Sequence, residues 1–208
     1  MTEKEKMLSG ILYDAYDEEL MQLRQNCRTL QDKLQKIDAN DNIAREEIYD
    51  QLLGSYGKGV YILNASFDYG KNTFIGDDFS SNFNLVVLDC ATVHIGNRVL
   101  IGPNCTIATP IHPLLSEERS IRTNQDGTRS LFEYAKPIVI EDDVWIASNV
   151  VIQGGVTIGQ GAVIAAGSVV TRDIPAGALA MGMPCRVVRM PTEDDKLMGS
   201  SLDPTGVL

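Results

Sequence analysis

Every sixth residue between positions 140 and 170 is a β-branched aliphatic. The residues that share this spacing are Ile140, Ile146, Ile152, Ile158, Ile164 and Val170. A period of six fits neither the 3.6-residue turn of an α-helix nor the two-residue alternation of an ordinary strand. It is typical of a parallel β-helix, in which a short strand and a tight corner recur three times in each turn of a triangular prism. We therefore expect a mainly β chain whose large aliphatic side chains point into the prism.

Two further features of the repeat support this prediction. The residue four places after each aliphatic is mostly small or medium in size, and we expect it to point inward near a corner. These residues are Val144, Val150, Val156, Ala162, Ser168 and Ile174. Gly, Asn and Asp recur between the apolar positions, where a corner requires positive φ. The same frame appears at Ile75-Gly76, Ile95-Gly96, Ile101-Gly102 and Ile107-Ala108, so residues 55–190 are predicted to form one β-helix domain.

Residues 1–54 have the pattern of an N-terminal helical subdomain. Thr2 and Glu5 have the spacing of a capping box, and Asp17 is a suitable N-cap for a second helix. A third helix is expected from about Asn42 to the residue before Gly54, which would stop it. We expect this subdomain to pack on the β-helix. Recruitment of a coiled-coil partner is the alternative, although the apolar seam is short for one.

The six-residue period stops between Pro110 and Pro137. The interrupting segment is polar and contains Gly127, so we expect an extended loop over residues 110–137. Long loops in compact domains usually have a function, and this one could reach a neighbouring subunit. Residues 191–208 follow the repeats and are predicted to form a C-terminal tail.

The charge and the apolar runs exclude several classes of protein. The net charge is −10, so nucleic acids and anionic membranes would be repelled at long range. The longest apolar runs are too short to span a bilayer. The first twenty residues are charged rather than apolar, from which we expect no signal peptide and a cytoplasmic protein. The four cysteines lack metal-binding spacing and are expected to be reduced.

Short segments spread along the chain point to one family. They are Glu5-Lys6-Met7-Leu8-Ser9-Gly10, Phe67-Asp68-Tyr69-Gly70, Asn82-Phe83-Asn84, His112-Pro113-Leu114, Glu133-Tyr134-Ala135-Lys136-Pro137, Val144-Trp145-Ile146 and Gly182-Met183-Pro184-Cys185-Arg186-Val187. Through these segments, residues 4–190 resemble the maltose/galactoside O-acetyltransferases of the hexapeptide acyltransferase superfamily. The resemblance implies a left-handed β-helix and a homotrimer with sites between subunits. It also implies transfer of acetyl from acetyl-CoA to a sugar hydroxyl, without a metal.

The chain has two histidines, which narrows the search for a general base. His94 lies between Val93 and Ile95, so strand alternation predicts that it points into solvent. The resemblance places the family's catalytic histidine at His112. An imidazole has an ordinary pKa of about 6.5, so it can accept the proton of a hydroxyl and pass it to a leaving thiolate. Spacing alone leaves a structural loop histidine equally open.

Glu133 matches a family position close to the catalytic histidine. A carboxylate there could fix the tautomer of His112, because a base needs a partner on its other ring nitrogen. The alternative is a solvated loop acid.

The resemblance also implies a set of acceptor-binding residues. Asn82 matches an acceptor-binding asparagine, and its amide can both donate and accept hydrogen bonds. A ladder of stacked asparagines at a corner of the prism is the alternative role. The expected acidic contacts with the acceptor are Asp68, Asp89, Asp14 and Asp17. The sequence leaves open whether the acceptor is maltose or glucose, a galactoside, a cell-surface oligosaccharide or a xenobiotic.

Coenzyme A carries phosphates, so an acidic protein must offer it local positive charge. The residues that the resemblance places along the donor are Trp145, Ser148, Ala166, Thr171, Arg172, Arg186 and Arg189. The arginines could instead only solvate an acidic surface, and Trp145 could be an outward capping aromatic.

Two other functions use the same prism. A metal-dependent hydratase needs three histidine ligands, more than the two that the chain contains. A non-catalytic repeat protein used for binding or assembly stays open, because fold does not dictate function. We predict direct acetyl transfer in a ternary complex, with His112 as the base.

Overall fold

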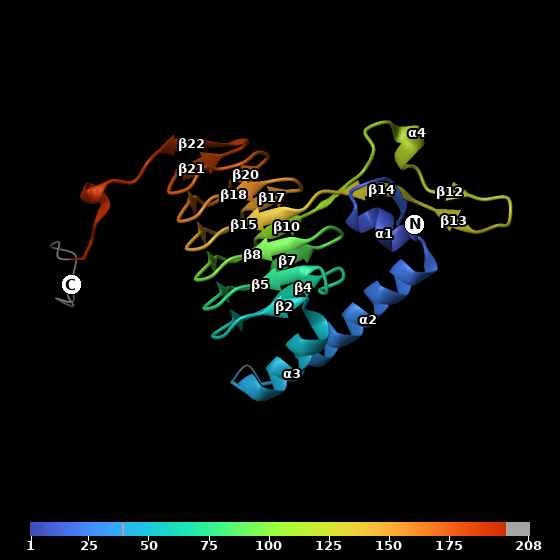
Figure 1. The fold of residues 1–208 in the computed structure, drawn as a ribbon, viewed down its shortest axis with the longest axis horizontal. Coiled ribbons are helices and arrows are strands. Elements are labelled where there is room, and N and C mark those ends of the chain that lie inside the picture. The colour runs from blue at the N-terminus through green and yellow to red at the C-terminus, as the bar shows by residue number, and fades with distance from the viewer. Residues whose placement is uncertain (39, 199–208) are drawn as a thin grey trace.

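A computed structural model describes residues 1–38 and 40–198. The repeats form a parallel β-helix whose stacked coils build a three-sided prism (Figure 1). Face 1 consists of β2 (Ser55–Tyr56), β5 (Thr73–Ile75), β8 (Val93–Ile95), β15 (Ile138–Ile140) and β18 (Thr157–Ile158). Face 2 consists of β3 (Tyr61–Ile62), β6 (Ser80–Ser81), β9 (Leu100–Ile101), β16 (Trp145–Ile146), β19 (Val163–Ile164) and β21 (Leu179–Gly182), with β22 (Cys185–Arg189) antiparallel at its edge. Face 3 consists of β4 (Ala65–Phe67), β7 (Leu85–Leu88), β10 (Thr106–Ala108), β17 (Val151–Gln153) and β20 (Val169–Val170).

The aliphatic residues of the six-residue repeat form the core, as predicted. All six, from Ile140 to Val170, are at most 1% exposed. Equivalent residues stack on one another, since Ile107, Ile152 and Val170 lie side by side on face 3. The residues four places further on are also buried. Burial of one such side chain stabilises the fold by about 1.5–3 kcal/mol, so the period of six is what holds the prism together.

Left-handed backbone at the corners explains the recurrent Asn, Asp and Gly. The non-glycine residues with positive φ are Asp78, Asn84, Arg98, Asn104, Asp143 and Asn149. Asn84 Nδ2 donates to Asn104 Oδ1 over 3.0 Å, so one corner carries a ladder of asparagine side chains. Arg98 is an unusual residue for such a corner, and its Nε binds Asp143 Oδ1 at 2.6 Å.

The N-terminal segment folds into α1 (Glu3–Leu8), β1 (Tyr13–Asp14), α2 (Glu18–Leu34) and α3 (Asn42–Leu52). The predicted caps are present, because Thr2 and Glu5 cap α1 reciprocally and Asp17 accepts from Leu20 N. As expected, α2 and α3 share a hydrophobic core with the first coils of the prism, and they run beside its N-terminal end in Figure 1. The short strand β1 was not predicted, because two residues are too few to show a period.

Gln31 joins α2 to the prism in a way that its sequence does not reveal. Its side chain is 8% exposed, within an otherwise apolar seam. The amide accepts from Phe67 N at 2.8 Å and donates to Phe67 O at 3.0 Å. The Gln31 side chain therefore hydrogen-bonds to the free edge of β4 as a neighbouring strand would. β4 is the edge strand at the N-terminal end of face 3.

Gly54 has a different role from the predicted helix stop. The extended residue Leu53 ends α3, and Gly54 N donates to Thr73 O as the chain enters the first coil. A Cβ at position 54 would lie 2.7 Å from the Lys71 carbonyl oxygen and 2.7 Å from the Phe74 ring. Close packing of the backbone, rather than a left-handed cap, requires glycine here.

The segment 110–137 has secondary structure of its own. It contains β11 (Pro110–Ile111), α4 (Ser116–Arg119), β12 (Arg122–Thr123), β13 (Arg129–Ser130) and β14 (Phe132–Ala135). β14 pairs antiparallel with both β1 and β11, while α4 and the β12–β13 hairpin project from the prism (Figure 1). This small sheet ties the N-terminal segment to the repeat domain.

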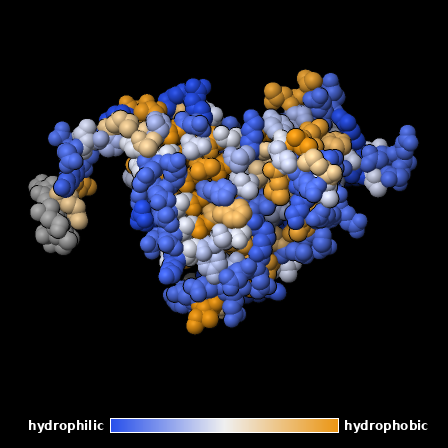
Figure 2. Space-filling view, in the orientation of Figure 1, coloured by the Kyte–Doolittle hydropathy of each residue, from blue (hydrophilic) through white to orange (hydrophobic). Residues whose placement is uncertain are grey.

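After β22 the chain continues through a short 3-10 helix, Glu193–Asp195, and the rest of the predicted tail, residues 199–208, lies outside the described residues. Figure 2 shows hydrophobic residues over the C-terminal hairpin and near α4. Within residues 1–38 and 40–198, no helix has both the length and the hydropathy needed to cross a membrane.

Candidate active site

His112 lies at the corner where face 3 passes into face 1. It follows β11, and its side chain is 50% exposed. Its Nε2 atom lies 3.4 Å from Oε2 of Glu133, whose side chain is 11% exposed. The pairing of Ile111 with Tyr134 brings these two residues together. The contact is long for a hydrogen bond, as such contacts often are before substrate binds.

A buried tyrosine holds the other side of the Glu133 carboxylate. Tyr13 lies directly opposite Glu133 in the β1–β14 pair and is completely buried. Its hydroxyl donates to Glu133 Oε1 and also borders the Cys90 thiol. The Cys90 thiol lies 3.8 Å from Asp68 Oδ2, so a continuous series of polar groups connects His112 to Asp68. No local sequence pattern marks Tyr13 as part of the site.

Burial determines the ionisation of this series. It raises the pKa of Tyr13 far above the ordinary value, and nearby Glu133 and Cys90 act in the same direction, so Tyr13 stays neutral and donates. Burial also raises the pKa of Cys90, which keeps its thiol protonated. The pKa of Asp68 is raised by burial, although Arg24 opposes the shift. Asp68 therefore carries a carboxylate whose charge is poorly solvated.

Asp89 is completely buried, which argues against the predicted contact with an acceptor. Its Oδ1 accepts from Tyr69 N at 2.8 Å. Its Oδ2 accepts from Asn72 N at 3.2 Å and from Thr73 Oγ1 at 3.1 Å. Asp89 thus organises the turn between β4 and β5 and offers no free oxygen to a ligand.

Asp14 and Asp17 also have bonds within the chain. Asp14 Oδ1 accepts from Leu131 N at 2.9 Å and from Tyr16 N at 3.0 Å, which anchors the projecting segment. Asp17 Oδ1 accepts from Leu20 N at 3.3 Å as the N-cap of α2. Both residues line a groove with Arg129, on the side of the projecting hairpin. The structure does not bring their carboxylates into the series around Glu133.

Three other predicted residues occupy a different corner, where face 2 passes into face 3. Asn82 follows β6, Ser148 follows β16 and Ala166 follows β19. Asn82 is exposed and accepts from Phe83 N at 2.8 Å, which leaves its amide NH₂ group available. Asn84, rather than Asn82, belongs to the asparagine ladder. At this corner, a Cβ at Gly167 would have no neighbour within 4 Å, so the backbone is open.

Trp145 points outward from face 2 and is 51% exposed. It stands in a column of residues in register across the face, namely Tyr61, Ser80, Leu100, Trp145, Val163 and Leu179. Tyr61 and Leu100 are also about half exposed, at 48% and 51%. The surface around Trp145 is therefore apolar, as a subunit contact or a ligand groove requires.

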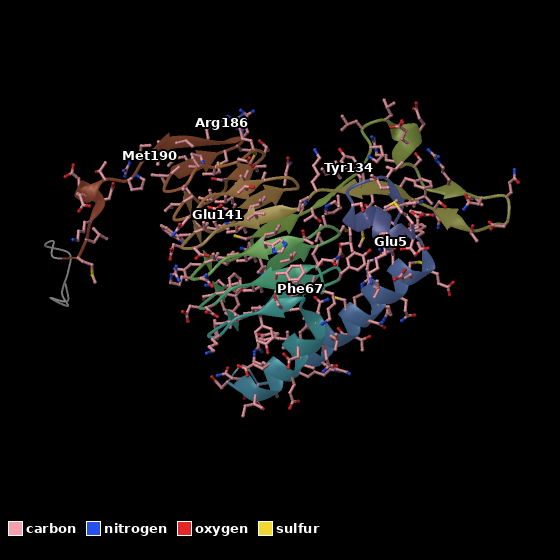
Figure 3. The ribbon with its side chains drawn as sticks, in the orientation of Figure 1. Glu5, Phe67, Tyr134, Glu141, Arg186 and Met190 are labelled. Carbon is pink, nitrogen blue, oxygen red and sulfur yellow. The ribbon has the colours of Figure 1, made fainter. Side chains whose placement is uncertain are left out.

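The candidate phosphate-binding arginines differ in availability. Arg172 follows β20 at the His112 corner, and Arg186 lies on β22 at the C-terminal end of the stack (Figure 3). Both are exposed, and neither has an ion pair with an acid in the described part of the chain. Arg189 instead forms an ion pair with Asp195, which lowers the pKa of that carboxyl to about 2. Arg172 and Arg186 therefore fit an anionic ligand better than Arg189.

Face 3 separates the two groups of predicted residues. His112, Glu133, Asp68, Thr171 and Arg172 lie at one of its edges, whereas Asn82, Ser148 and Ala166 lie at the other. The potential ligand residues of the described chain form no group of three or more suited to a metal ion. A hexapeptide β-helix with an imidazole–carboxylate pair at one corner defines the class of hexapeptide-repeat acyltransferases.

Comparisons with known proteins agree with this class. The profile described as "Maltose acetyltransferase hexapeptide capping motif" matches residues 6–57. The "Bacterial transferase hexapeptide (six repeats)" profile matches residues 137–172, and "Hexapeptide repeat of succinyl-transferase" matches residues 92–112.

Individual relatives cover nearly the whole chain. A galactoside O-acetyltransferase from Escherichia coli (strain K12) is 38% identical over 193 residues, which are 92% of this chain and 91% of the relative. The crystal structure of a maltose O-acetyltransferase from Clostridium difficile 630 superposes with a TM-score of 0.81 at 39% identity, over 93% of this chain and 99% of the other. A hexapeptide-repeat acetyltransferase from Vibrio cholerae O1 biovar eltor, solved with acetyl coenzyme A, has a TM-score of 0.79 at 38% identity, over 91% and 98% of the chains. The chain belongs to the maltose/galactoside O-acetyltransferase family and is an acetyltransferase.

Proposed function

We propose that the protein transfers the acetyl group of acetyl-CoA to a hydroxyl of a sugar, with His112 as the general base. The contact between His112 and Glu133 carries this proposal. A half-exposed imidazole can reach a substrate, and the Glu133 carboxylate on its other side can fix its tautomer. A structural loop histidine needs neither feature.

Glu133 and His112 have different roles in the proposed mechanism. Glu133 faces Nε2 of His112 and favours a proton on that atom, which leaves Nδ1 free. Nδ1 accepts the proton of the acceptor hydroxyl as the oxygen attacks, and it then passes the proton to the departing sulfur. Proton transfer of this kind contributes about a hundred- to ten-thousand-fold to the rate. Bound acetyl-CoA supplies a thioester carbonyl that is open to attack.

The chain has suitable groups for the donor. Arg172 and Arg186 offer exposed guanidinium groups that can bind phosphate oxygens. Ser148, Ala166 and Gly167 form an open corner with little side-chain bulk, along which a pantetheine arm can lie. Trp145 provides an apolar wall beside it on face 2, and Thr171 extends the donor track at the far edge of face 3.

The separation of the predicted residues by face 3 supports sites between subunits. In one chain, Asn82 and Ser148 lie across the face from His112. In a homotrimer, the Asn82 corner of one copy would meet the His112 corner of its neighbour, and the apolar column around Trp145 would be covered. Closed symmetry of this kind buries an apolar surface without leaving an open edge.

The acceptor site is built from the exposed Asn82 amide and from Asp68, both of which can bind sugar hydroxyls. We propose a maltose-, glucose- or galactoside-like acceptor. Cell-surface oligosaccharides and xenobiotic alcohols are the alternatives. The hydrogen bonds of Asp89, Asp14 and Asp17 within the chain assign these three residues to the framework of the site.

An acceptor screen with detection of the released thiol tests the proposal. Purified protein is incubated with acetyl-CoA and each of maltose, glucose, a galactoside, an oligosaccharide and a simple aromatic alcohol. We expect release of CoA that depends on a sugar and is absent without an acceptor. If no acceptor increases the release, and calorimetry detects no binding of acetyl-CoA, the chain is a non-catalytic repeat protein.

A further inference from the structure

We infer that Tyr13, from the N-terminal segment, is a positioning residue for the catalytic pair, and this inference rests on the function proposed for His112. Tyr13 touches neither the expected substrate nor the reacting atoms. It acts through Glu133, whose two oxygens have different partners: Oε1 accepts from the Tyr13 hydroxyl, and Oε2 faces His112 Nε2.

The backbone fixes this arrangement. Tyr13 and Glu133 are directly paired across β1 and β14, so their side chains leave the sheet on the same side. Tyr13 is 0% exposed and packs in a cluster with Met7, Leu20 and Ala135. A hydroxyl held this firmly locks the plane of the Glu133 carboxylate. With Oε1 fixed in this way, Oε2 is held facing His112.

The polar surroundings restrict Tyr13 to a donor. The groups that face its hydroxyl from the elements packed around it are Glu133 of β14 and Cys90 of the turn after β7. Burial is the main reason that a phenolate is disfavoured, and both groups act in the same direction. The hydroxyl therefore keeps its proton over the working range of pH, and its hydrogen bond directs that proton at Glu133.

This arrangement gives the N-terminal segment a part in the site besides covering the end of the prism. The helices α1 and α2 flank β1 on both sides, and their cluster holds Tyr13 in place. The structure thus connects the folding of the N-terminal segment to the orientation of a base on the projecting segment.

The first test is Tyr13→Phe, which removes the hydroxyl and keeps the ring. We expect kcat to fall about 10- to 100-fold while KM for the acceptor stays within about twofold, because an orienting partner is lost and no substrate contact is removed. Tyr49→Phe is the matched control. It is also a buried tyrosine, but its hydroxyl accepts from Arg45 within the same helix, α3, so kcat should be retained.

A double-mutant cycle tests whether Tyr13 acts through Glu133. The combined variant Y13F/E133A should have the kcat of E133A alone, within about twofold, because the hydroxyl then has no acceptor left to orient. Full multiplication of the two losses would overturn the inference, as would unchanged kcat in Tyr13→Phe.

A readout that needs no substrate separates this inference from the proposed function. The ¹⁵N shifts of the imidazole nitrogens report which tautomer is present, and the chain has two histidines, so His94 is an internal reference. We expect one dominant tautomer of His112 in the wild type, a mixture in Tyr13→Phe, and an unchanged His94. The same tautomer population in both proteins would refute the positioning role, even if the enzyme is active. A protein that releases no CoA but shows the change would refute only the function.

Discussion

Nε2 of His112 and Oε2 of Glu133 lie 3.4 Å apart, although 21 positions separate the two residues in the sequence. The strand pair β11–β14 closes this distance, since it returns the projecting segment to the corner from which it left. The base and its partner are thus fixed by backbone pairing at both ends of the insertion.

His112→Ala should lower acceptor-dependent CoA release about a hundred- to ten-thousand-fold, because no other imidazole is near to accept the proton. The melting temperature should stay close to that of the wild type, since the side chain is half exposed. His94→Ala is the control. It removes a ring stacked on Phe74 on face 1, and turnover should persist. Retained turnover in His112→Ala would remove this residue from the mechanism.

Glu133→Gln removes the charge beside His112 but preserves the shape of the side chain. We expect kcat to fall about 10- to 100-fold with little change in KM, because the amide can present an NH₂ group to the imidazole and no longer selects its tautomer. Steady-state kinetics with varied acceptor checks this. A raised KM at constant kcat would instead place Glu133 in contact with the acceptor.

Asp89→Ala should lower the free energy of unfolding by about 3 kcal/mol, because three donors lose their acceptor in a buried turn. Urea unfolding followed by circular dichroism measures the loss. Asp32→Ala, at an exposed position of α2, is the control and should change stability by no more than about 0.5 kcal/mol. A large rise in acceptor KM without loss of stability would restore Asp89 as a binding residue.

Asp68→Asn should stabilise the protein more at pH 7 than at pH 4. Burial raises the pKa of Asp68, so the charged form costs the folded state free energy. That cost is absent below the unfolded-state pKa of about 3.9 and grows as the pH rises through the folded-state pKa. Asparagine removes the charge at every pH. Urea titrations of both proteins at the two pH values give the comparison, and a difference that is independent of pH would contradict it.

Gln31→Leu should destabilise the protein by about 2 kcal/mol, because the buried N–H of Phe67 would lose its acceptor and the Phe67 carbonyl would keep only the weak Cys27 thiol donor. The change is close to neutral in volume, so the effect reports the hydrogen bonds. Gln25→Leu is the matched control on the exposed side of the same helix, with an expected change below about 0.5 kcal/mol. Equal stabilities of the two variants in thermal unfolding would show that Gln31 does not hold β4.

The sequence predicted the prism in detail because its period is local. Each of the residues Ile140, Ile146 and Ile152 has the same environment, so one pattern repeated along the chain specifies both the strand and the inward direction. The caps at Thr2 and Asp17 were predictable for the same reason, because a cap bonds to residues only three positions away.

The site could be predicted only in part. The family resemblance pointed to His112 and Glu133. It also suggested Asp89 as an acceptor-binding residue, but both oxygens of Asp89 accept hydrogen bonds within a turn. The role of Tyr13 could not be predicted, because its partner Glu133 lies 120 positions further along the chain. Gly54 was misassigned because its constraint is a carbonyl oxygen of the next coil.

The sequence alone is enough to predict the repeating prism, the helical N-terminal segment and the two histidines from which a base could come. The folded structure is needed to see which polar groups meet: Tyr13 with Glu133, Glu133 with His112, and Gln31 with Phe67. Buried and exposed positions follow one another with a short period along the chain, so the order of apolar and polar residues in the sequence shows which positions are buried. Contacts between distant segments leave no such pattern, because they depend on how the projecting segment and the N-terminal helices pack against the same corner and the first coils of the prism.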